Sequence, residues 1–269
     1  NLAKLGPEMW PRMEKVRKKI YKFSPDLVVS DWEMFSTFIA KMLKKPLVSF
    51  DNQHFLVYGK FKVPDNHMSE FIKARIFIYG LVAKAKYHVI SYFSGVKVKK
   101  KKNVYLVPPV IRDKILKANV SVKNHVVVYQ STEKYQKLLK VLKKIDQKFI
   151  VYGYNIAKKE KNLTFKKFDE QSFIKDLVSC KAVICNGGFT LISEAVYLGK
   201  PLLVLPITGH FEQVLNGINV KKRRAGEFVK KLSVQNVERF LGRVENYRRG
   251  KRKGYNNKKL FWILDHIIK

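Results

Sequence analysis

Short apolar runs alternate with helical patterns along almost the whole chain. Residues 8–23 have the apolar spacing of a helix, and 26–31 form an apolar run that ends in two polar residues, which is typical of a buried parallel strand. The alternation continues with a helix over 34–43, a strand over 46–51, a helix over 67–85, and strands over 87–91 and 103–108. This pattern predicts an α/β domain with a doubly wound parallel sheet, which binds ligands at the carboxyl ends of its strands.

The second half of the chain repeats this rhythm. Strands are predicted over 125–130, 149–153, 163–168, 182–186 and 201–206, separated by helices over 133–145, 170–180, 189–198 and 211–222. Residues 109–124 have few strand signals and are the best candidate for a linker. We therefore expect two Rossmann-like domains, over 1–112 and 113–250, followed by a basic segment and a terminal helix over 251–269.

The first predicted domain lacks a part that this architecture normally has. A Rossmann-like domain usually opens with a strand and a glycine-rich loop, whereas this chain starts at Asn1 with a helical pattern. We expect the missing strand, loop and helix to lie upstream of Asn1, so that the first domain is incomplete here.

Composition restricts the function classes without choosing one. The 269 residues are 46% hydrophobic, which is enough for a full core and argues against general disorder. Two cysteines, Cys180 and Cys185, cannot form a disulfide framework or a four-cysteine zinc site, which suits a reducing cytoplasm. No apolar run is long enough for a transmembrane helix. The net charge of +34 is consistent with a protein that binds nucleic acid, an anionic membrane or a phosphorylated substrate. It is equally consistent with a lysine-rich surface that has no specific partner.

The most informative segment follows the predicted strand 182–186. Asn186 ends that strand, and the pair Gly187 and Gly188 opens the next helix; glycine amides at a helix start can approach a phosphate closely. Thr190 can cap the helix or donate its hydroxyl hydrogen, and Glu194 lies one turn further on the same face. Its carboxylate could accept hydrogen bonds from a ribose. The alternative is a simple tight turn with a solvated Glu194, but several such features in register favour a binding site.

The next strand delivers a second set of polar groups to the same edge. After Pro206 the chain supplies His210, Glu212 and Gln213, whose side chains suit sugar hydroxyls.

At these residues the sequence resembles the GT-B glycosyltransferases. The resemblance is greatest to the group that includes the N-acetylglucosaminyltransferase forming peptidoglycan lipid II (glycosyltransferase family 28, C-terminal type) and related archaeal and bacterial transferases. The family pattern is Gly-Gly-x-x-Thr-x-x-Glu-Ala, Gly-x-Pro and Gln-x-x-Asn. It is matched, with the threonine one residue early, by Gly187, Gly188, Thr190, Glu194, Ala195, Gly199, Pro201, Gln213 and Asn216.

The resemblance implies a nucleotide-sugar donor, expected to be a UDP-sugar, bound mainly by the second domain. It places Gly187, Gly188 and Thr190 at the diphosphate, Glu194 at the ribose, Glu212 and Gln213 at the sugar, Phe168 at the base, and Ser131 and Thr132 beneath the phosphates. Asn186, His210 and Asn216 complete the expected donor site. Such transferases use no metal ion or other cofactor, because helix amides stabilise the leaving diphosphate.

The acceptor side is less well defined by the sequence. The family's glycine-rich acceptor loop and the histidine that often follows it have no counterpart here, so the base cannot be assigned. Asp31, Asp51 and His54 at predicted strand ends are weak candidates, and each can equally be structural. The expected reaction is an inverting transfer to a membrane-associated or cell-envelope glycan acceptor.

Aromatic and basic residues also alternate within 55–87. A helix there could rest on an anionic membrane or a lipid phosphate through Lys73, Arg75, Lys84 and Lys86, or could be an ordinary crossover helix. The expected location is therefore the cytoplasm, with peripheral attachment at the inner face of the membrane as an option.

Three other functions fit parts of the sequence. A UDP-sugar 2-epimerase shares this architecture. A noncatalytic subunit would supply only a donor-binding site, with the glycine-rich acceptor loop on a second polypeptide. A basic nucleic-acid-binding protein would use the charge of +34, but the chain has no helix-turn-helix or RNP-like signature, so no specific nucleic acid is expected. The sequence leaves the oligomeric state open.

Overall fold

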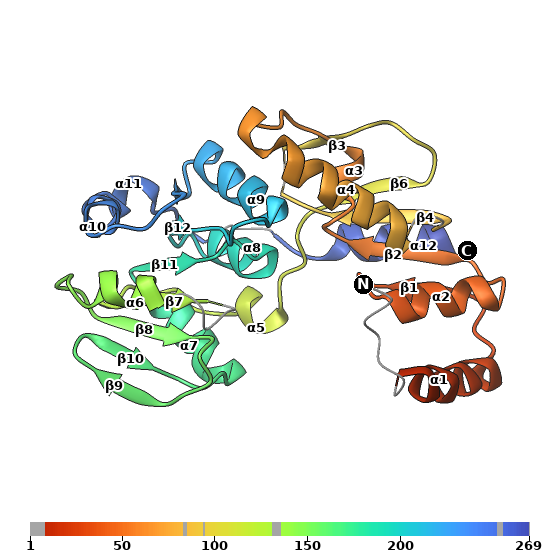
Figure 1. Cartoon of the computed structure of the whole chain (residues 1–269), viewed down its shortest axis with the longest axis horizontal. Coiled ribbons are helices and arrows are strands. Elements are labelled where there is room, and N and C mark those ends of the chain that lie inside the picture. Colours follow the sequence, from red (N-terminus) through yellow and green to blue (C-terminus); the bar gives the residue numbers. More distant parts are fainter. Residues whose placement is uncertain (1–8, 83–84, 94, 131–135, 252–254, 269) are drawn as a thin grey trace. The chain divides into compact units, whose positions relative to one another are not determined.

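The computed structural model describes residues 9–82, 85–93, 95–130, 136–251 and 255–268. The chain forms two compact units (Figure 1). The first comprises Asn1–Pro109 together with Lys258–Lys269, and the second comprises Val110–Asn257. The terminal helix, which the sequence set apart as a third segment, thus belongs to the first unit.

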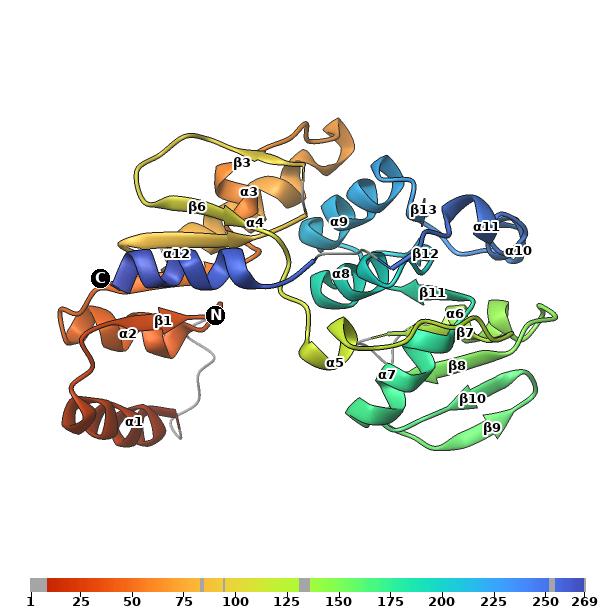
Figure 2. The ribbon, with the colours of Figure 1, turned by 180° about the vertical axis from the view of Figure 1, so that it is seen from behind.

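The first unit is built on a parallel sheet with the strand order β1-β2-β4-β6. The strands are β1 (Val28–Ser30), β2 (Leu47–Asp51), β4 (Tyr87–Ser91) and β6 (Val104–Val107). The terminal helix α12 (Lys258–Ile268) lies along this sheet (Figure 2), and its Leu260 and Ile263 share a core with Val48 and Val89. This packing explains why the end of the chain groups with its beginning.

Three helices of the first unit follow the predicted pattern with small shifts: α1 (Met9–Phe23), α2 (Met34–Met42) and α4 (Met68–Val82). The short helix α3 (Phe55–Tyr58) and the 3-10 helix η2 (Asp65–His67) were not predicted. The carboxylate of Glu33 fixes the start of α2 by accepting hydrogen bonds at 2.6 Å from the amides of Phe35 and Ser36. A small antiparallel pair, β3 (Gly59–Lys60) and β5 (Lys97–Val98), was not predicted.

The second unit has a larger sheet with the order β13-β12-β11-β7-β8-β10-β9. Its strands are β7 (Val126–Tyr129), β8 (Phe149–Tyr152), β9 (Lys158–Glu160), β10 (Leu163–Phe165), β11 (Ala182–Cys185), β12 (Leu202–Val204) and β13 (Gly226–Phe228). All neighbouring strands are parallel except β9, which pairs antiparallel with β10. The helices are α5 (Asp113–Leu116), α6 (Gln136–Leu142), α7 (Glu170–Ser179), α8 (Phe189–Tyr197), α9 (Phe211–Lys222), α10 (Val234–Gly242) and α11 (Val244–Tyr247).

The order of these strands defines where a ligand would bind. The unit starts in the middle of its sheet with β7, adds β8 and β10 on one side, and then adds β11, β12 and β13 on the other. The direction of strand addition therefore reverses between β7 and β11, whose last residues Tyr129 and Cys185 are register partners. Open α/β sheets bind ligands beside the carboxyl ends of the strands at such a reversal.

The predicted linker 109–124 is packed rather than extended. It contains α5, and Ile111 and Ile115 are buried in it. The ammonium of Lys251 donates hydrogen bonds to the carbonyls of Leu116 and Ala118 at 2.6 and 2.7 Å. This segment is therefore an integral part of the second unit.

Candidate functional site

The turn from β11 into α8 lies at the reversal point of the second sheet. Gly187 has a φ of +98°, and a Cβ atom there would lie 3.0 Å from both Cβ and the carbonyl oxygen of Gln213, so glycine is required. Gly188 is the N-cap residue of α8 and is exposed; a Cβ atom on it would meet no protein atom within 4 Å. The N-cap of α8 is thus exposed and has open space where a side chain would stand, and helix N-termini are positions at which proteins bind phosphate groups.

Two residues of α9 hold this turn in place. The side-chain nitrogen of Asn216 donates to the carbonyl of Gly187 at 3.0 Å, and Asn216 is fully buried. The side-chain oxygen of Gln213 accepts a hydrogen bond at 2.9 Å from the amide of Ile207. The Gln-x-x-Asn part of the sequence pattern therefore supports the glycine turn and the loop after β12.

Glu194 on α8 is engaged by an arginine that the sequence did not single out. The Nε and Nη2 atoms of Arg112 donate to the two oxygens of Glu194 at 2.6 and 2.8 Å. Only 1% of the Glu194 side chain is exposed, against 33% of the Arg112 side chain. The Nη1 atom of Arg112 also donates to Glu170 at 3.0 Å. The hydrogen bond with Glu194, opposed by partial burial, raises the pKa of the Arg112 guanidinium.

The remaining expected donor residues differ in accessibility. Thr190 and His210 are exposed, and Asn186 is buried at the end of β11. Phe168, after β10, is 57% exposed, and its ring centroid lies 5.6 Å from that of Phe173. Glu212 is partly buried in the first turn of α9. Ser131 and Thr132 lie outside the described residues.

A buried glutamine at the same edge was missed by the sequence analysis. Gln130 directly follows β7 and is 0% exposed. Within the described part of the chain, neither its side-chain nitrogen nor its side-chain oxygen has a hydrogen-bond partner. The local sequence does not predict that Gln130 is buried, because its burial depends on how the whole edge of the sheet is packed.

In the first unit the structure brings two of the three acceptor-side candidates together. The Nδ1 atom of His54 lies 2.7 Å from Oδ2 of Asp51, and the hydroxyl of Ser49 donates to the same oxygen at 2.5 Å. Burial disfavours the charge of Asp51, but the hydrogen bonds from His54 and Ser49 outweigh it and hold the pKa of Asp51 below its usual value. The backbone amide of His54 donates to Asp51 Oδ1 at 2.8 Å, so Asp51 also fixes the start of α3.

The third candidate, Asp31, has a different environment. Partial burial, and then the negative charge of Asp51, raise the pKa of Asp31. His88 on β4 lies beside the pair, with its ring centroid 4.5 Å from that of His54. Burial, and then the charge of His54, lower the pKa of His88 to about 4.

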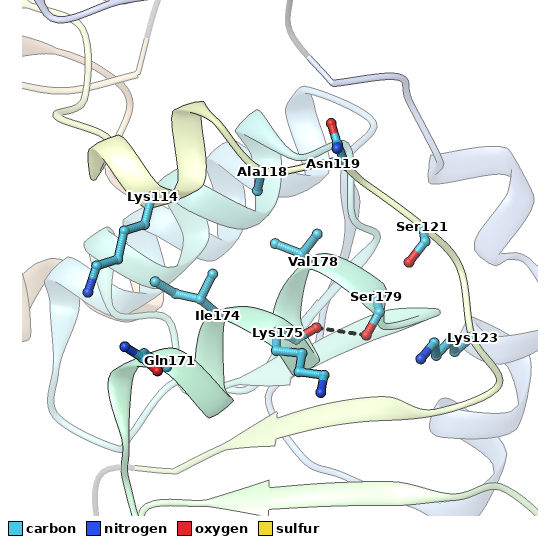
Figure 3. A pocket seen from close by; sticks show the side chains of 10 residues that line it. All are labelled: Lys114, Ala118, Asn119, Ser121, Lys123, Gln171, Ile174, Lys175, Val178 and Ser179. Atoms are coloured by element: carbon cyan, nitrogen blue, oxygen red, sulfur yellow. Dashed lines mark hydrogen bonds between the residues drawn. The ribbon is translucent and has the colours of Figure 1, made fainter.

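A separate shallow pocket of about 410 Å³ lies in the second unit, between the segment around α5 and the helix α7. Figure 3 shows an apolar floor of Ala118, Ile174 and Val178, and three lysine side chains, Lys114, Lys123 and Lys175, that extend in different directions. The three lysine side chains therefore do not gather around one point of the pocket. None of the expected donor residues lines it.

Among the described residues, no three His, Cys, Asp or Glu side chains are grouped as metal ligands would be. No described helix combines the length and apolar character needed to cross a bilayer.

Comparisons with known proteins identify the class. A family described as glycosyl transferase family 1 matches residues 1–245. The chain therefore belongs to this family and is a glycosyltransferase. No curated protein matches it.

Solved structures show the same fold. Spinosyn forosaminyltransferase SpnP is 16% identical with a TM-score of 0.62, and 95% of this chain aligns with 79% of that chain. The glycosyltransferase of kitacinnamycin is 11% identical with a TM-score of 0.60, over 95% of this chain and 79% of the other. The calicheamicin glycosyltransferase CalG4 is 12% identical with a TM-score of 0.56, and 96% of this chain aligns with 80% of that chain. These likenesses confirm the predicted GT-B fold, while the narrower likeness to the lipid II-forming group stays a prediction.

Proposed function

We propose that this glycosyltransferase takes its sugar from a nucleoside diphosphate donor, with a UDP-sugar as the expected co-substrate. One observation carries the proposal: the start of α8 opens at Gly188 onto free space, beside the reversal point between β7 and β11. The exposed ring of Phe168, at the same edge of the sheet, supports stacking of a nucleobase.

The reaction needs a group that accepts negative charge on the leaving diphosphate. When the bond between the anomeric carbon and the phosphate oxygen breaks, that charge grows next to the α8 amides, and the positive end of the helix stabilises it without a metal ion. In an inverting transfer the acceptor hydroxyl attacks the anomeric carbon directly and loses its proton to a base. We propose Asp51 and His54 as the candidates for that base, since they already share a hydrogen bond.

The donor proposal is tested with Gly188→Val. Gly188 has a φ of −60° and open space beside it, so valine should fit without strain, while its side chain fills the volume that a phosphate would occupy. We expect calorimetry to show UDP binding by the wild-type chain and at least a tenfold loss in the variant, with an unchanged melting temperature. EDTA should leave the binding unaffected.

The matched control is Gly242→Val, at the end of α10, where an added Cβ atom also meets nothing within 4 Å. This variant should bind UDP as the wild type does. Absence of UDP binding by the wild-type chain, or equal binding by Gly188→Val, contradicts the proposal.

For the acceptor we propose a membrane-associated or cell-envelope glycan precursor. An exposed apolar face of α4 supports this proposal. Met68, Ile72 and Ile76 lie four residues apart on that helix and are exposed to solvent, and the exposed fraction of Ile76 is 67%. Phe77 and Tyr79 extend this apolar face, and exposed Lys73 lies within it. An apolar helix face with lysine suits the interface of an anionic bilayer.

Sedimentation with vesicles tests the membrane part separately. The wild-type chain should bind phosphatidylcholine vesicles that contain phosphatidylglycerol, bind pure phosphatidylcholine weakly, and dissociate partly at high salt. The double variant Ile72→Ser/Ile76→Ser should lose most of the binding. Val120→Ser/Val122→Ser, at exposed apolar positions of the second unit, is the control that should retain it. Equal binding by both double variants contradicts the membrane face.

A further inference from the structure

The pocket between α5 and α7 has a surface chemistry of its own and lies apart from the expected donor residues (Figure 3). We call it the α5–α7 groove; its volume of about 410 Å³ falls within the range of protein sites that bind ligands. Ile174 and Val178, one turn apart on α7, form its floor together with Ala118. Among the ten residues that line the groove, three are lysines and none is acidic.

The wall that faces α7 is fixed by hydrogen bonds. The backbone amides of Ser121 and Lys123 donate to the carbonyls of Val178 and Ser179 at 3.2 and 2.7 Å, so this wall also satisfies acceptors at the end of α7. The buried ammonium of Lys200 donates to the carbonyl of Ser121 at 2.6 Å. The groove is therefore a preformed part of the fold, and a ligand would not have to order its wall.

The lysines at the rim leave the groove with an excess of positive charge. Lys114 pairs with Glu170, but Lys123 and Lys175 are exposed and form no ion pair within the described part of the chain. The whole chain has a net charge of +34. An anionic partner is therefore favoured at this groove, both on approach and when bound.

The shape of the groove distinguishes between anionic partners. Because the three ammonium groups do not gather around one point, they would not hold a compact phosphate together. A flat bilayer surface would leave a hollow with an apolar floor unfilled, and a nucleic acid would find no aromatic lining residue on which a base could stack. A peptide fits both features, since an aliphatic side chain fills the floor while carboxylates spaced along the backbone reach separate lysines.

We propose that the α5–α7 groove docks an acidic segment of a partner protein, with one aliphatic side chain on the floor and carboxylates on either side of it. The inference goes beyond the sugar transfer and does not depend on the proposed donor. None of the expected donor residues lines the groove, so docking should leave UDP binding unchanged.

Fluorescence anisotropy of the full chain with labelled peptides tests the proposal at about 0.15 M salt. The probe is Glu-Glu-Leu-Glu-Glu, and the wild-type chain should bind it about fivefold or more tightly than Glu-Glu-Ser-Glu-Glu, because only leucine gains from burial in the groove. Replacing the four glutamates of the probe with glutamine should weaken binding by a similar factor.

Two variants of the chain separate the floor from the rim. Ala118→Phe fills the floor without changing the charge, and it should lower the affinity for the leucine peptide to that for the serine peptide. Lys123→Gln/Lys175→Gln should weaken binding of the leucine peptide about fivefold or more. Its matched control is Lys137→Gln/Lys140→Gln, which removes two charges from exposed positions of α6 and should bind nearly as the wild type does.

The outcomes that overturn the proposal are specific. They are the absence of peptide binding, equal binding of the leucine and serine peptides by the wild-type chain, or an equal loss in the two lysine double variants, which would assign binding to overall charge. A folded Ala118→Phe that keeps the leucine preference overturns it as well. If that variant does not fold, the lysine variants and the two peptides decide the question.

A labelled single-stranded oligonucleotide serves as the competing probe. If Ala118→Phe loses binding of the oligonucleotide but not of the peptide, the groove takes nucleic acid and the proposal is wrong. Calorimetry with UDP on the same variants keeps the donor function separate, because its failure would leave the peptide results unchanged.

Discussion

The imidazole of His54 and the carboxylate of Asp51 form a buried pair, with Nδ1 and Oδ2 2.7 Å apart and both residues enclosed at the carboxyl end of β2. The same carboxylate accepts hydrogen bonds from the hydroxyl of Ser49 and from the backbone amide of His54. One side chain thus joins the end of a strand to the start of α3. This arrangement gives Asp51 a structural role whether or not it also serves as a base.

Asp51→Asn should therefore destabilise the protein. The substitution removes the charge from three hydrogen bonds in a buried site, and we expect a loss of about 1–3 kcal/mol in the free energy of unfolding. Urea unfolding followed by circular dichroism measures it. Asp31→Asn, at a carboxylate without such bonds to Ser49 or His54, is the control and should change stability by less. Equal effects of the two variants would contradict this account.

Stability should also fall between pH 6.5 and pH 4 because of His88. Its folded-state pKa of about 4 lies below the ordinary value of 6.5, so in this window the unfolded chain takes up a proton that the folded chain does not. Unfolding is favoured as the pH falls, by on the order of 2 kcal/mol. Asp51, whose folded-state pKa is lowered, loses its contribution only below its ordinary value of 3.8.

Urea unfolding of His88→Phe over the same pH range tests this origin. Phenylalanine keeps a ring beside His54 and Tyr58 but cannot take up a proton. The variant should lose much of the slope of stability against pH. A slope equal to that of the wild type would assign the pH dependence to other groups.

The two neighbouring glycines of the β11–α8 turn should differ in how much stability they lose on the same substitution. Gly187→Ala places a methyl group 3.0 Å from atoms of Gln213 and forces alanine to a φ of +98°, which should cost about 1–3 kcal/mol of stability. Gly188→Ala meets no atom within 4 Å and should be nearly neutral. Thermal unfolding of the two variants compares them directly, and similar melting temperatures would disprove the difference.

The parts of the fold that sequence patterns predicted are those with strong local signals. The strand over 87–91 and the helix over 211–222 were predicted with the bounds that the structure has. The strand β9 was missed because its sequence Lys-Lys-Glu is polar and, among the described strands, it pairs at the sheet edge with β10 alone. Likewise β13 is three residues long and begins with glycine, so it has no alternating pattern to detect.

In the candidate site, too, the residues that are close in the sequence were predicted, and those brought together by packing were not. The turn at Gly187 and the carboxylate of Glu194 lie within one strand–turn–helix segment, so spacing alone brought them together. Arg112 reaches Glu194 only because α5 packs in the second unit, and no spacing rule connects positions so far apart. The roles of Gln213 and Asn216 as supports of the turn became clear only from their hydrogen bonds.

Gln130 offers a test of the sheet edge that does not depend on any ligand. Both polar atoms of its side chain are buried and, within the described residues, have no partner, which costs about 1–3 kcal/mol. Gln130→Leu replaces them with apolar atoms of similar volume, so it should raise the free energy of unfolding by about 1 kcal/mol in urea titrations. The matched control is Gln147→Leu. The side-chain amide of Gln147 donates a hydrogen bond at 3.3 Å to the carbonyl of Asn124, so its removal should lower the free energy of unfolding. Destabilisation by Gln130→Leu as large as that by Gln147→Leu would mean that the amide of Gln130 is paired in the folded protein.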